Sequence, residues 1–125
     1  MSSRKPLFWA GACKEDLKRF PDEVQDTMGY ALDLAQQGNR HLDAKPLSGF
    51  GGAGVLEIVD DFQGNAYRAV YTVKFAGAVY ALHAFQKKSK KGIATPHRDM
   101  DLVRARLKSA ETHYAGWIRQ QAEND

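Results

Sequence analysis

The sequence predicts an α+β fold in which two N-terminal helices pack on a mainly antiparallel sheet and an amphipathic helix follows near the C-terminus. Two patterns lead to this class. Apolar residues recur at three- and four-residue steps near both ends of the chain, and three runs of β-forming residues with short turns between them lie in the middle. With 125 residues, 43% of them hydrophobic and 26% charged, the chain has the size and composition of one globular domain over residues 1–125.

The chain begins with a strand pattern and a short helix pattern. Residues 5–11, KPLFWAG, form a short apolar run after a proline and predict a first strand. Residues 14–20 place Leu17 and Phe20 three positions apart among charged residues, which is typical of a short helix. Pro21 then ends or interrupts that helix.

A second helix is expected from Asp22, which suits the N-cap position because Gln25 follows three residues later. Gly38 and Asn39 are residues that commonly close a helix in the left-handed conformation. The apolar face of this helix consists of Val24, Met28, Ala31 and Ala35.

Residues 40–54 are rich in glycine, contain a proline and show no period, so they predict a loop. The GFGGAG sequence within them resembles a dinucleotide-binding fingerprint, but that fingerprint needs a strand before it and a helix after it. Here a helix precedes and a strand follows, so we interpret the glycines as a flexible loop. Lys45 in this loop is a candidate phosphate contact.

Three β-type runs follow, at residues 55–62, 66–75 and 78–87. Residues 63–65 connect the first two runs, and Ala76 and Gly77 connect the last two. The pattern therefore predicts a three-stranded antiparallel meander.

A two-residue turn at positions 76 and 77 would pair Val70 with His83 and Arg68 with Phe85. Alternation with period two then separates two faces of this hairpin. The face expected to pack against the helices carries Tyr67, Ala69, Tyr71, Val73, Tyr80, Leu82 and Ala84. The opposite face carries Arg68, Val70, Thr72, Lys74, His83, Phe85 and Lys87.

A last helix is expected to begin at Thr95 and Pro96, which suit its N-cap and first position, with Asp99 near its positive end. The helix would continue to about residue 121. Its apolar stripe consists of Val103, Leu107, Ala110, Tyr114 and Ile118. Two interpretations of the stripe stay open: it docks on the sheet of its own chain, or it binds a partner protein, for which Tyr114 and Trp117 are suitable contacts.

Positive charge is concentrated in residues 66–98, a segment called the basic stretch below. It contains no acidic residue, whereas the whole chain carries a net charge of only +3. A concentrated basic surface favours a polyanionic partner such as nucleic acid. The basic residues of the stretch are Arg68, Lys74, Lys87, Lys88, Lys90, Lys91 and Arg98.

Several other classes find no support in the sequence. No apolar run approaches the roughly 18 residues of a membrane helix, and no signal-peptide core precedes the first charges, so we expect a cytoplasmic protein that does not enter a membrane. The only cysteine, Cys13, excludes an internal disulfide and is expected to fill space. We expect no metal and no small-molecule cofactor, since the histidines at positions 41, 83, 97 and 113 are scattered.

Basic and histidine side chains on a sheet are suited to RNA cleavage by the substrate's own 2′-hydroxyl. Such a reaction needs removal of the hydroxyl proton, stabilisation of charge on the phosphate and protonation of the leaving 5′ oxygen. Arg68 lies mid-strand, so it either faces a site or pairs with an acid such as Glu57. His83 and His97 are candidates for proton transfer, although each also has a purely structural interpretation.

The sequence resembles the phage-derived branch of the RelE/ParE toxin superfamily, close to HigB-type toxins. The resemblance rests on KPLSGFGGAGVLEIV, YRAVYTVKF and YALHAFQKKSKKGIATPHRDMDLVRARL, which extend it over most of residues 5–107. It implies a type II toxin that cleaves mRNA at the ribosome and is neutralised by a cognate helix-turn-helix antitoxin. The tyrosine found near the end of RelE-type toxins has no clear match, because Tyr114 lies within a long helix.

The resemblance and the residue patterns together give one set of expected site residues. Within the superfamily, Arg68 matches a phosphate-contacting arginine, and Lys87 and Lys88 match the basic end of the last main strand. The catalytic candidates are Arg68, His83, Lys88 and His97, and the expected RNA contacts are Lys45, Lys74, Lys87, Lys90, Lys91 and Arg98. Two alternatives stay open: a ParE-like toxin that inhibits DNA gyrase, and a catalytically inactive phage-derived module that binds nucleic acid or protein.

Overall fold

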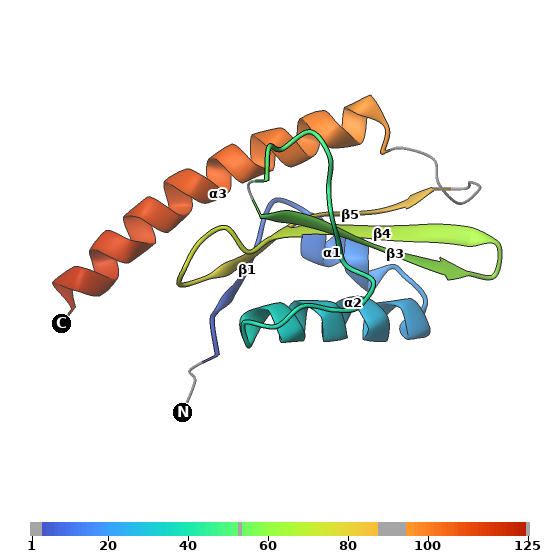
Figure 1. Cartoon of the computed structure of the whole chain (residues 1–125), viewed down its shortest axis with the longest axis horizontal. Helices are drawn as coiled ribbons and strands as arrows, with labels where there is room; N and C mark the ends of the chain where they lie inside the picture. Colours follow the sequence, from blue (N-terminus) through green and yellow to red (C-terminus); the bar gives the residue numbers. More distant parts are fainter. Residues whose placement is uncertain (1–3, 53, 88–94, 125) are drawn as a thin grey trace.

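The computed structural model describes residues 4–52, 54–87 and 95–124, and its helices and strands are arranged around a single five-stranded sheet (Figure 1). The α+β class is therefore confirmed. The elements are β1 (Leu7–Trp9), α1 (Cys13–Lys18), α2 (Asp22–Gln36), β2 (Lys45–Pro46), β3 (Val55–Phe62), β4 (Asn65–Thr72), β5 (Val79–Lys87) and α3 (His97–Glu123).

The strands lie in the order β1-β5-β4-β3-β2, and only β1 and β5 run parallel. The meander of β3, β4 and β5 confirms the three predicted strands, and β3 has the expected bounds. Strand β2 was not expected, because residues 40–54 were interpreted wholly as a loop. Lys45 pairs there with Glu57, and Pro46 pairs with Leu56, so this two-residue strand forms one edge of the sheet.

Helices α1 and α2 cover one face of the sheet (Figure 1). Their buried side chains pack against Ile58 and Tyr71 of the sheet, and Val24 and Met28 among them have no exposed surface. Helix α2 ends after Gln36, and Gly38 has a φ of +84°, the left-handed conformation expected at this position.

Helix α3 crosses the opposite face of the sheet (Figure 1). Val103, Leu107 and Ala110 are buried against Val70 and other residues of β4 and β5, so the stripe of this helix docks on its own sheet. The first helical residue is His97, one position later than the expected Pro96. Pro96 occupies the N-cap instead, with an extended φ of −60° and ψ of 151°.

The pairing of β4 with β5 contains one irregularity that changes which side chains share a face. Val70 pairs with His83 and Arg68 with Phe85, as expected, but Tyr71 pairs with Ala81. Leu82 is therefore an extra residue in β5, a β-bulge.

The bulge corrects one prediction about the two faces. Tyr80 and Leu82 were expected on the face of α1 and α2, but they are buried under α3. The face that carries Arg68 and His83, which was expected to be open for binding, is covered by α3 over much of its area.

Candidate functional site

Arg68 lies on the α3 side of β4 and is bound to an acidic side chain. Its side chain is 6% exposed, and its Nη1 lies 3.3 Å from Oε2 and 3.4 Å from Oε1 of Glu57. The same nitrogen lies 3.4 Å from the hydroxyl oxygen of Thr95. Of the two alternatives that the sequence left for Arg68, the structure contains the ion pair with Glu57.

Glu57 joins the sheet to the segment that leads into α3. The hydroxyl of Thr95 donates a hydrogen bond of 2.9 Å to Oε2 of Glu57, across 38 positions of the sequence. The carboxylate therefore orients both the guanidinium of Arg68 and the residue that precedes the N-cap of α3. From the sequence, Glu57 was expected only as a possible partner of Arg68 and not as a member of the site.

His83 lies beside this network and uses both ring nitrogens inside the protein. Its Nε2 lies 2.7 Å from Oδ1 of Asp99, and its Nδ1 lies 3.4 Å from Nη1 of Arg106. A guanidinium only donates hydrogen bonds, so Nδ1 accepts from Arg106 and the ring proton on Nε2 is donated to Asp99. The His83 ring also stacks on Phe85 at a centroid distance of 4.7 Å. This geometry favours a role in holding α3 on the sheet.

Arg106 was not recognised from the sequence, although a signal for it exists. It is three positions after Val103 and four before Ala110, so it lies on the buried stripe of α3. Its Nη1 donates a 2.9 Å hydrogen bond to the carbonyl of the bulge residue Leu82. The guanidinium also packs against the backbone of Gly11, where a Cβ atom would lie only 2.9 Å from Nη2.

A shallow hollow opens next to Glu57 at the edge of the sheet. It has a volume of about 200 Å³ and is lined by Asp43, Lys45, Glu57 and Val59. Lys45 is exposed and is the register partner of Glu57, so a cationic and an anionic side chain occupy neighbouring strands at this edge. The Glu57 side chain is 15% exposed, which leaves its carboxylate partly accessible.

The remaining expected site residues fall into three groups. His97 and Arg98 are exposed at the start of α3, two and three positions after Thr95. Lys87 is the last residue of β5 and pairs with Ala66. Lys88, Lys90 and Lys91 lie outside the described residues.

Lys74 lies away from this group. Its Nζ forms a 3.2 Å ion pair with Glu111 and lies 5.7 Å from the centroid of the Phe75 ring. Glu111 is about four turns, or roughly 21 Å, along α3 from His97. The structure therefore links Arg68 and Lys45 through Glu57 and ties His83 to the first turn of α3 through Asp99, whereas Lys74 lies elsewhere and no contact of His97 or Arg98 joins them to this group among the described residues.

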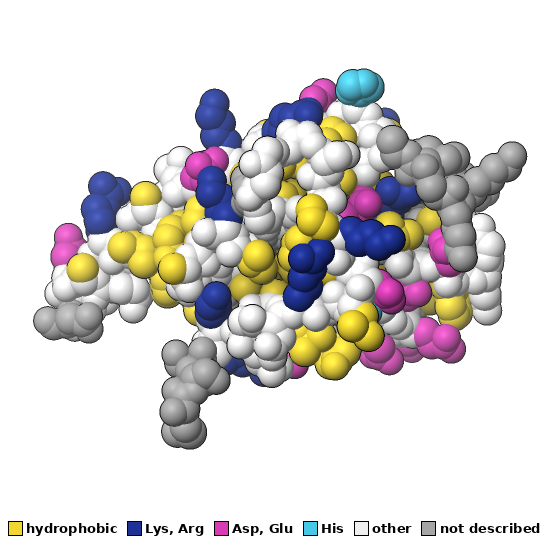
Figure 2. All heavy atoms as spheres, in the orientation of Figure 1, with side chains coloured by type: hydrophobic (Ala, Val, Ile, Leu, Met, Phe, Trp, Pro, Cys, Tyr) yellow, Lys and Arg dark blue, Asp and Glu magenta, His cyan; other side chains and the backbone are white. Residues whose placement is uncertain are grey.

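The charge of the basic stretch is partly neutralised in the folded chain. Glu57 pairs with Arg68 and Glu111 pairs with Lys74, both from outside the stretch. On the face that Figure 2 shows, acidic side chains accordingly lie beside basic ones in the central region. The expectation of a wholly unopposed cluster is corrected, because acids distant in sequence return to these bases in space.

Cys13 is buried in the core with 1% of its surface exposed. Burial is the main cause that raises the pKa of its thiol from 9.0 to about 12, while the charge of Arg106 lowers it by a smaller amount. A thiol that keeps its proton is a poor nucleophile, so Cys13 serves as a packing residue. Within the described ranges, no three His, Cys, Asp or Glu side chains are grouped closely enough to hold a metal ion.

The fold and the hollow beside Glu57 define the class of this protein. It is a small α+β domain in which helices cover both faces of a mainly antiparallel sheet and a hollow lined by charged side chains is open at one edge. A family model described as Phage derived protein Gp49-like (DUF891) matches residues 15–108. Because this match spans more than half of the chain, the chain belongs to the Gp49-like family of phage-derived proteins, which is a RelE/ParE-like toxin family.

Comparisons with the curated proteins and with the solved structures find no match. Over the residues that the structure describes, no helix is both long enough and apolar enough to cross a membrane.

Proposed function

We propose that this chain is the toxin of a type II toxin-antitoxin system and inhibits translation as a ribosome-dependent mRNA endonuclease of the HigB type. The observation that carries the proposal is the hollow beside Glu57, where a partly exposed carboxylate lies next to the exposed cation Lys45. The membership of the chain in a RelE/ParE-like toxin family supports the choice of target.

The proposed reaction uses the 2′-hydroxyl of the mRNA as the nucleophile. Glu57 accepts the hydroxyl proton, the 2′ oxygen bonds to phosphorus, and the bond from phosphorus to the 5′ oxygen breaks. The products are a 2′,3′-cyclic phosphate and a 5′-hydroxyl end. His97, exposed close to Thr95, is assigned the protonation of the leaving 5′ oxygen.

The basic residues bind the RNA backbone in this proposal. Lys45 lines the hollow beside Glu57, and Lys87, Lys88, Lys90, Lys91 and Arg98 are included in the RNA-binding surface as expectations from the sequence. Lysine and arginine offset the phosphate charge without a metal ion. Arg68 orients the carboxylate of Glu57, and His83 holds α3 against the sheet, so both act as positioning residues.

Binding to the ribosome and neutralisation by a helix-turn-helix antitoxin in the cytoplasm belong to the same proposal. They rest on the resemblance to HigB-type toxins. Co-expression with the product of an adjacent small helix-turn-helix gene should restore growth of cells that express the chain.

A non-catalytic binding protein is the second candidate function, and one observation favours it. Arg68 and His83, two of the residues expected to perform the chemistry, are both bound to acidic partners inside the protein. A chain of this kind would bind the ribosome, or DNA gyrase in the manner of ParE-like toxins, without cutting RNA.

Mapping of mRNA 5′ ends after induced expression distinguishes these functions. The nuclease produces new ends at fixed positions within codons, and Glu57→Gln removes them. Growth arrest with DNA damage signalling and no new ends would favour gyrase inhibition, and growth arrest without either would favour binding alone.

The matched control for the basic residues is Lys14→Ala, an exposed lysine on α1. Lys45→Ala should reduce cleavage while Lys14→Ala leaves it unchanged. Circular dichroism on each purified variant establishes that a loss of cleavage is not a loss of folding. Equal effects of the two substitutions would remove Lys45 from the site.

A further inference from the structure

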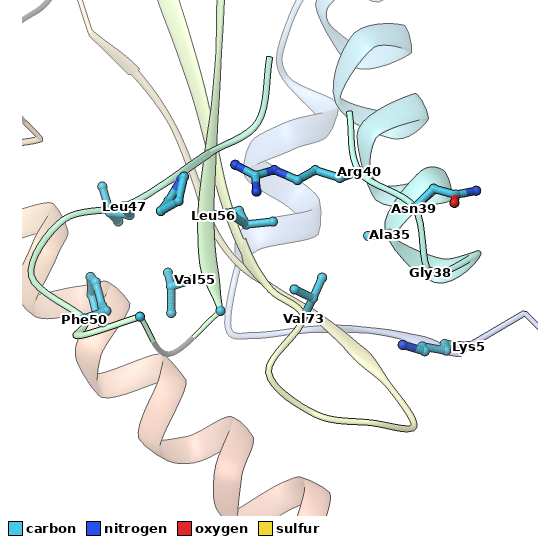
Figure 3. Close-up of a pocket in the computed structure, with 13 residues that line it drawn as sticks. Lys5, Ala35, Gly38, Asn39, Arg40, Leu47, Phe50, Val55, Leu56 and Val73 are labelled. Atoms are coloured by element: carbon cyan, nitrogen blue, oxygen red, sulfur yellow. The ribbon is translucent and has the colours of Figure 1, made fainter. Parts of the chain in front are cut away.

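A second and larger cavity lies between the end of α2, the loop before β3 and the end of β4 (Figure 3). Its volume is about 470 Å³, within the range of roughly 300–1,000 Å³ that is usual for small-molecule sites. Apolar side chains form most of its wall, including Leu47, Phe50, Leu56 and Val73. None of its lining residues lines the hollow beside Glu57.

Two cations extend into this apolar cavity. In Figure 3 the side chain of Arg40 extends from the residues after α2 to Leu56, and Lys5 lies at the opposite end of the cavity with its ammonium toward Val73. No acidic residue is among the described residues that line the cavity. Arg40 is exposed and Lys5 is half-buried, so both keep contact with solvent, and a cavity wall that is apolar with cations and without acids is complementary to an apolar group that carries a negative charge.

Arg40 is fixed in place but keeps donor capacity. Its Nε and Nη2 donate hydrogen bonds of 3.1 Å and 2.8 Å to the carbonyl of Ala44. These bonds hold the guanidinium plane in one orientation, and no interaction of its Nη1 is found within the described part of the chain. Pre-organised donors of this kind bind anions at a low entropic cost.

We propose that this cavity binds a small organic anion that has a carboxylate, phosphate or sulfonate group on an apolar body. The anionic group lies beside the Arg40 guanidinium, the apolar body lies against Leu47, Phe50 and Leu56, and the charge of Lys5 at the other end of the cavity adds to the attraction. Binding here is independent of RNA cleavage, because the two sites share no lining residue.

Anilinonaphthalene sulfonate is a suitable probe, because it joins one sulfonate to an apolar aromatic body and fluoresces when bound. The full-length chain is made by cell-free synthesis, so toxicity to cells does not limit the yield. The proposal predicts binding of one probe molecule per chain. Arg40→Gln should weaken binding about tenfold, since it removes one charge-assisted contact, and Lys5→Gln should weaken it by a smaller factor, since it removes a more distant positive charge.

The matched controls separate this site from general apolar binding. Lys108→Gln changes an exposed lysine on α3 and should leave the affinity for the probe unchanged. The neutral analogue N-phenylnaphthylamine should bind at least tenfold more weakly than the sulfonate. In nuclear magnetic resonance spectra the probe should shift the amide signals of Gly38, Leu47 and Leu56.

Three results would overturn the proposal: equal binding of the neutral analogue, equal loss of affinity in Lys108→Gln, or shifted signals that map elsewhere. Thermal unfolding by circular dichroism accompanies each variant. If Arg40→Gln does not fold, because its bonds to Ala44 are lost, Lys5→Gln still tests the charge requirement.

Discussion

Removal of the Arg68 guanidinium should destabilise the fold, because it leaves the carboxylate of Glu57 largely buried without its cation. The two side chains are 6% and 15% exposed, so solvent screens their interaction little. Loss of one partner of such a pair costs roughly 3–5 kcal/mol. The contacts of 3.3 Å and 3.4 Å are long for an ion pair, and the hollow admits water to Glu57, so we expect the lower end of this range for Arg68→Met.

Urea unfolding at pH 7, followed by circular dichroism, measures this effect. A loss of about 3 kcal/mol with a slope near 1.5 kcal/mol per molar lowers the midpoint by about 2 M. A double-mutant cycle with Glu57→Gln isolates the pair, and the double variant should recover at least about 1 kcal/mol relative to the sum of the single losses. A loss below about 0.5 kcal/mol together with additive single effects would refute the interior ion pair.

Three further predictions follow from burial and charge. Burial raises the pKa of the Cys13 thiol from 9.0 to about 12, so the folded chain keeps the thiol proton up to a higher pH than the unfolded chain does. The stability that the protonated thiol contributes should therefore be lost as the pH rises from 9 to 12. Cys13→Ala should make that part of the pH profile of the unfolding free energy less steep, with the buried Tyr71 and Tyr80 hydroxyls accounting for part of the remaining slope, and an unchanged profile would contradict the assignment. Met28→Ala should lower the free energy of unfolding by roughly 2–5 kcal/mol, because Met28 has no exposed surface and its truncation leaves a cavity; a midpoint in urea equal to that of the unaltered chain would show that the core is not packed here. Lys74→Ala should change the stability by less than about 0.5 kcal/mol, because its pair with Glu111 is 32% and 48% exposed, and a larger loss in the same titration would assign that pair a structural role.

Local sequence patterns predicted most of the elements, because caps and turns act over a few residues. The bounds of β3 are an example, and α2 begins at Asp22 as expected, although Pro21 and not Asp22 occupies its N-cap and no side chain caps it. In the hairpin of β4 and β5, the predicted pairs Val70–His83 and Arg68–Phe85 are confirmed, whereas the pairs nearer the turn are shifted by one residue. The bulge at Leu82 was not predictable from alternation, which assumes an unbroken ladder, and the donor to its carbonyl, Arg106, is 24 positions away in the sequence.

The candidate site was less predictable, because its pairs join residues far apart in the chain. Arg68 and Glu57 are 11 positions apart, His83 and Asp99 are 16 apart, and Thr95 and Glu57 are 38 apart. The prediction made from the absence of acids in residues 66–98 therefore overestimated the unpaired positive charge, because Glu57 and Glu111, from outside this segment, pair with two of its bases. Asp99 was interpreted only as a favourable charge at a helix start, although it also binds His83.

The most direct test of the proposed function uses purified ribosomes programmed with an mRNA that carries a single 2′-deoxynucleotide at the position of the cut. The full-length chain should cleave the all-ribose message to a 2′,3′-cyclic phosphate and a 5′-hydroxyl end. It should leave the substituted message intact, and Glu57→Gln should cleave neither. Cleavage of the 2′-deoxy message at the same position, or no cleavage of the all-ribose message, would contradict the account.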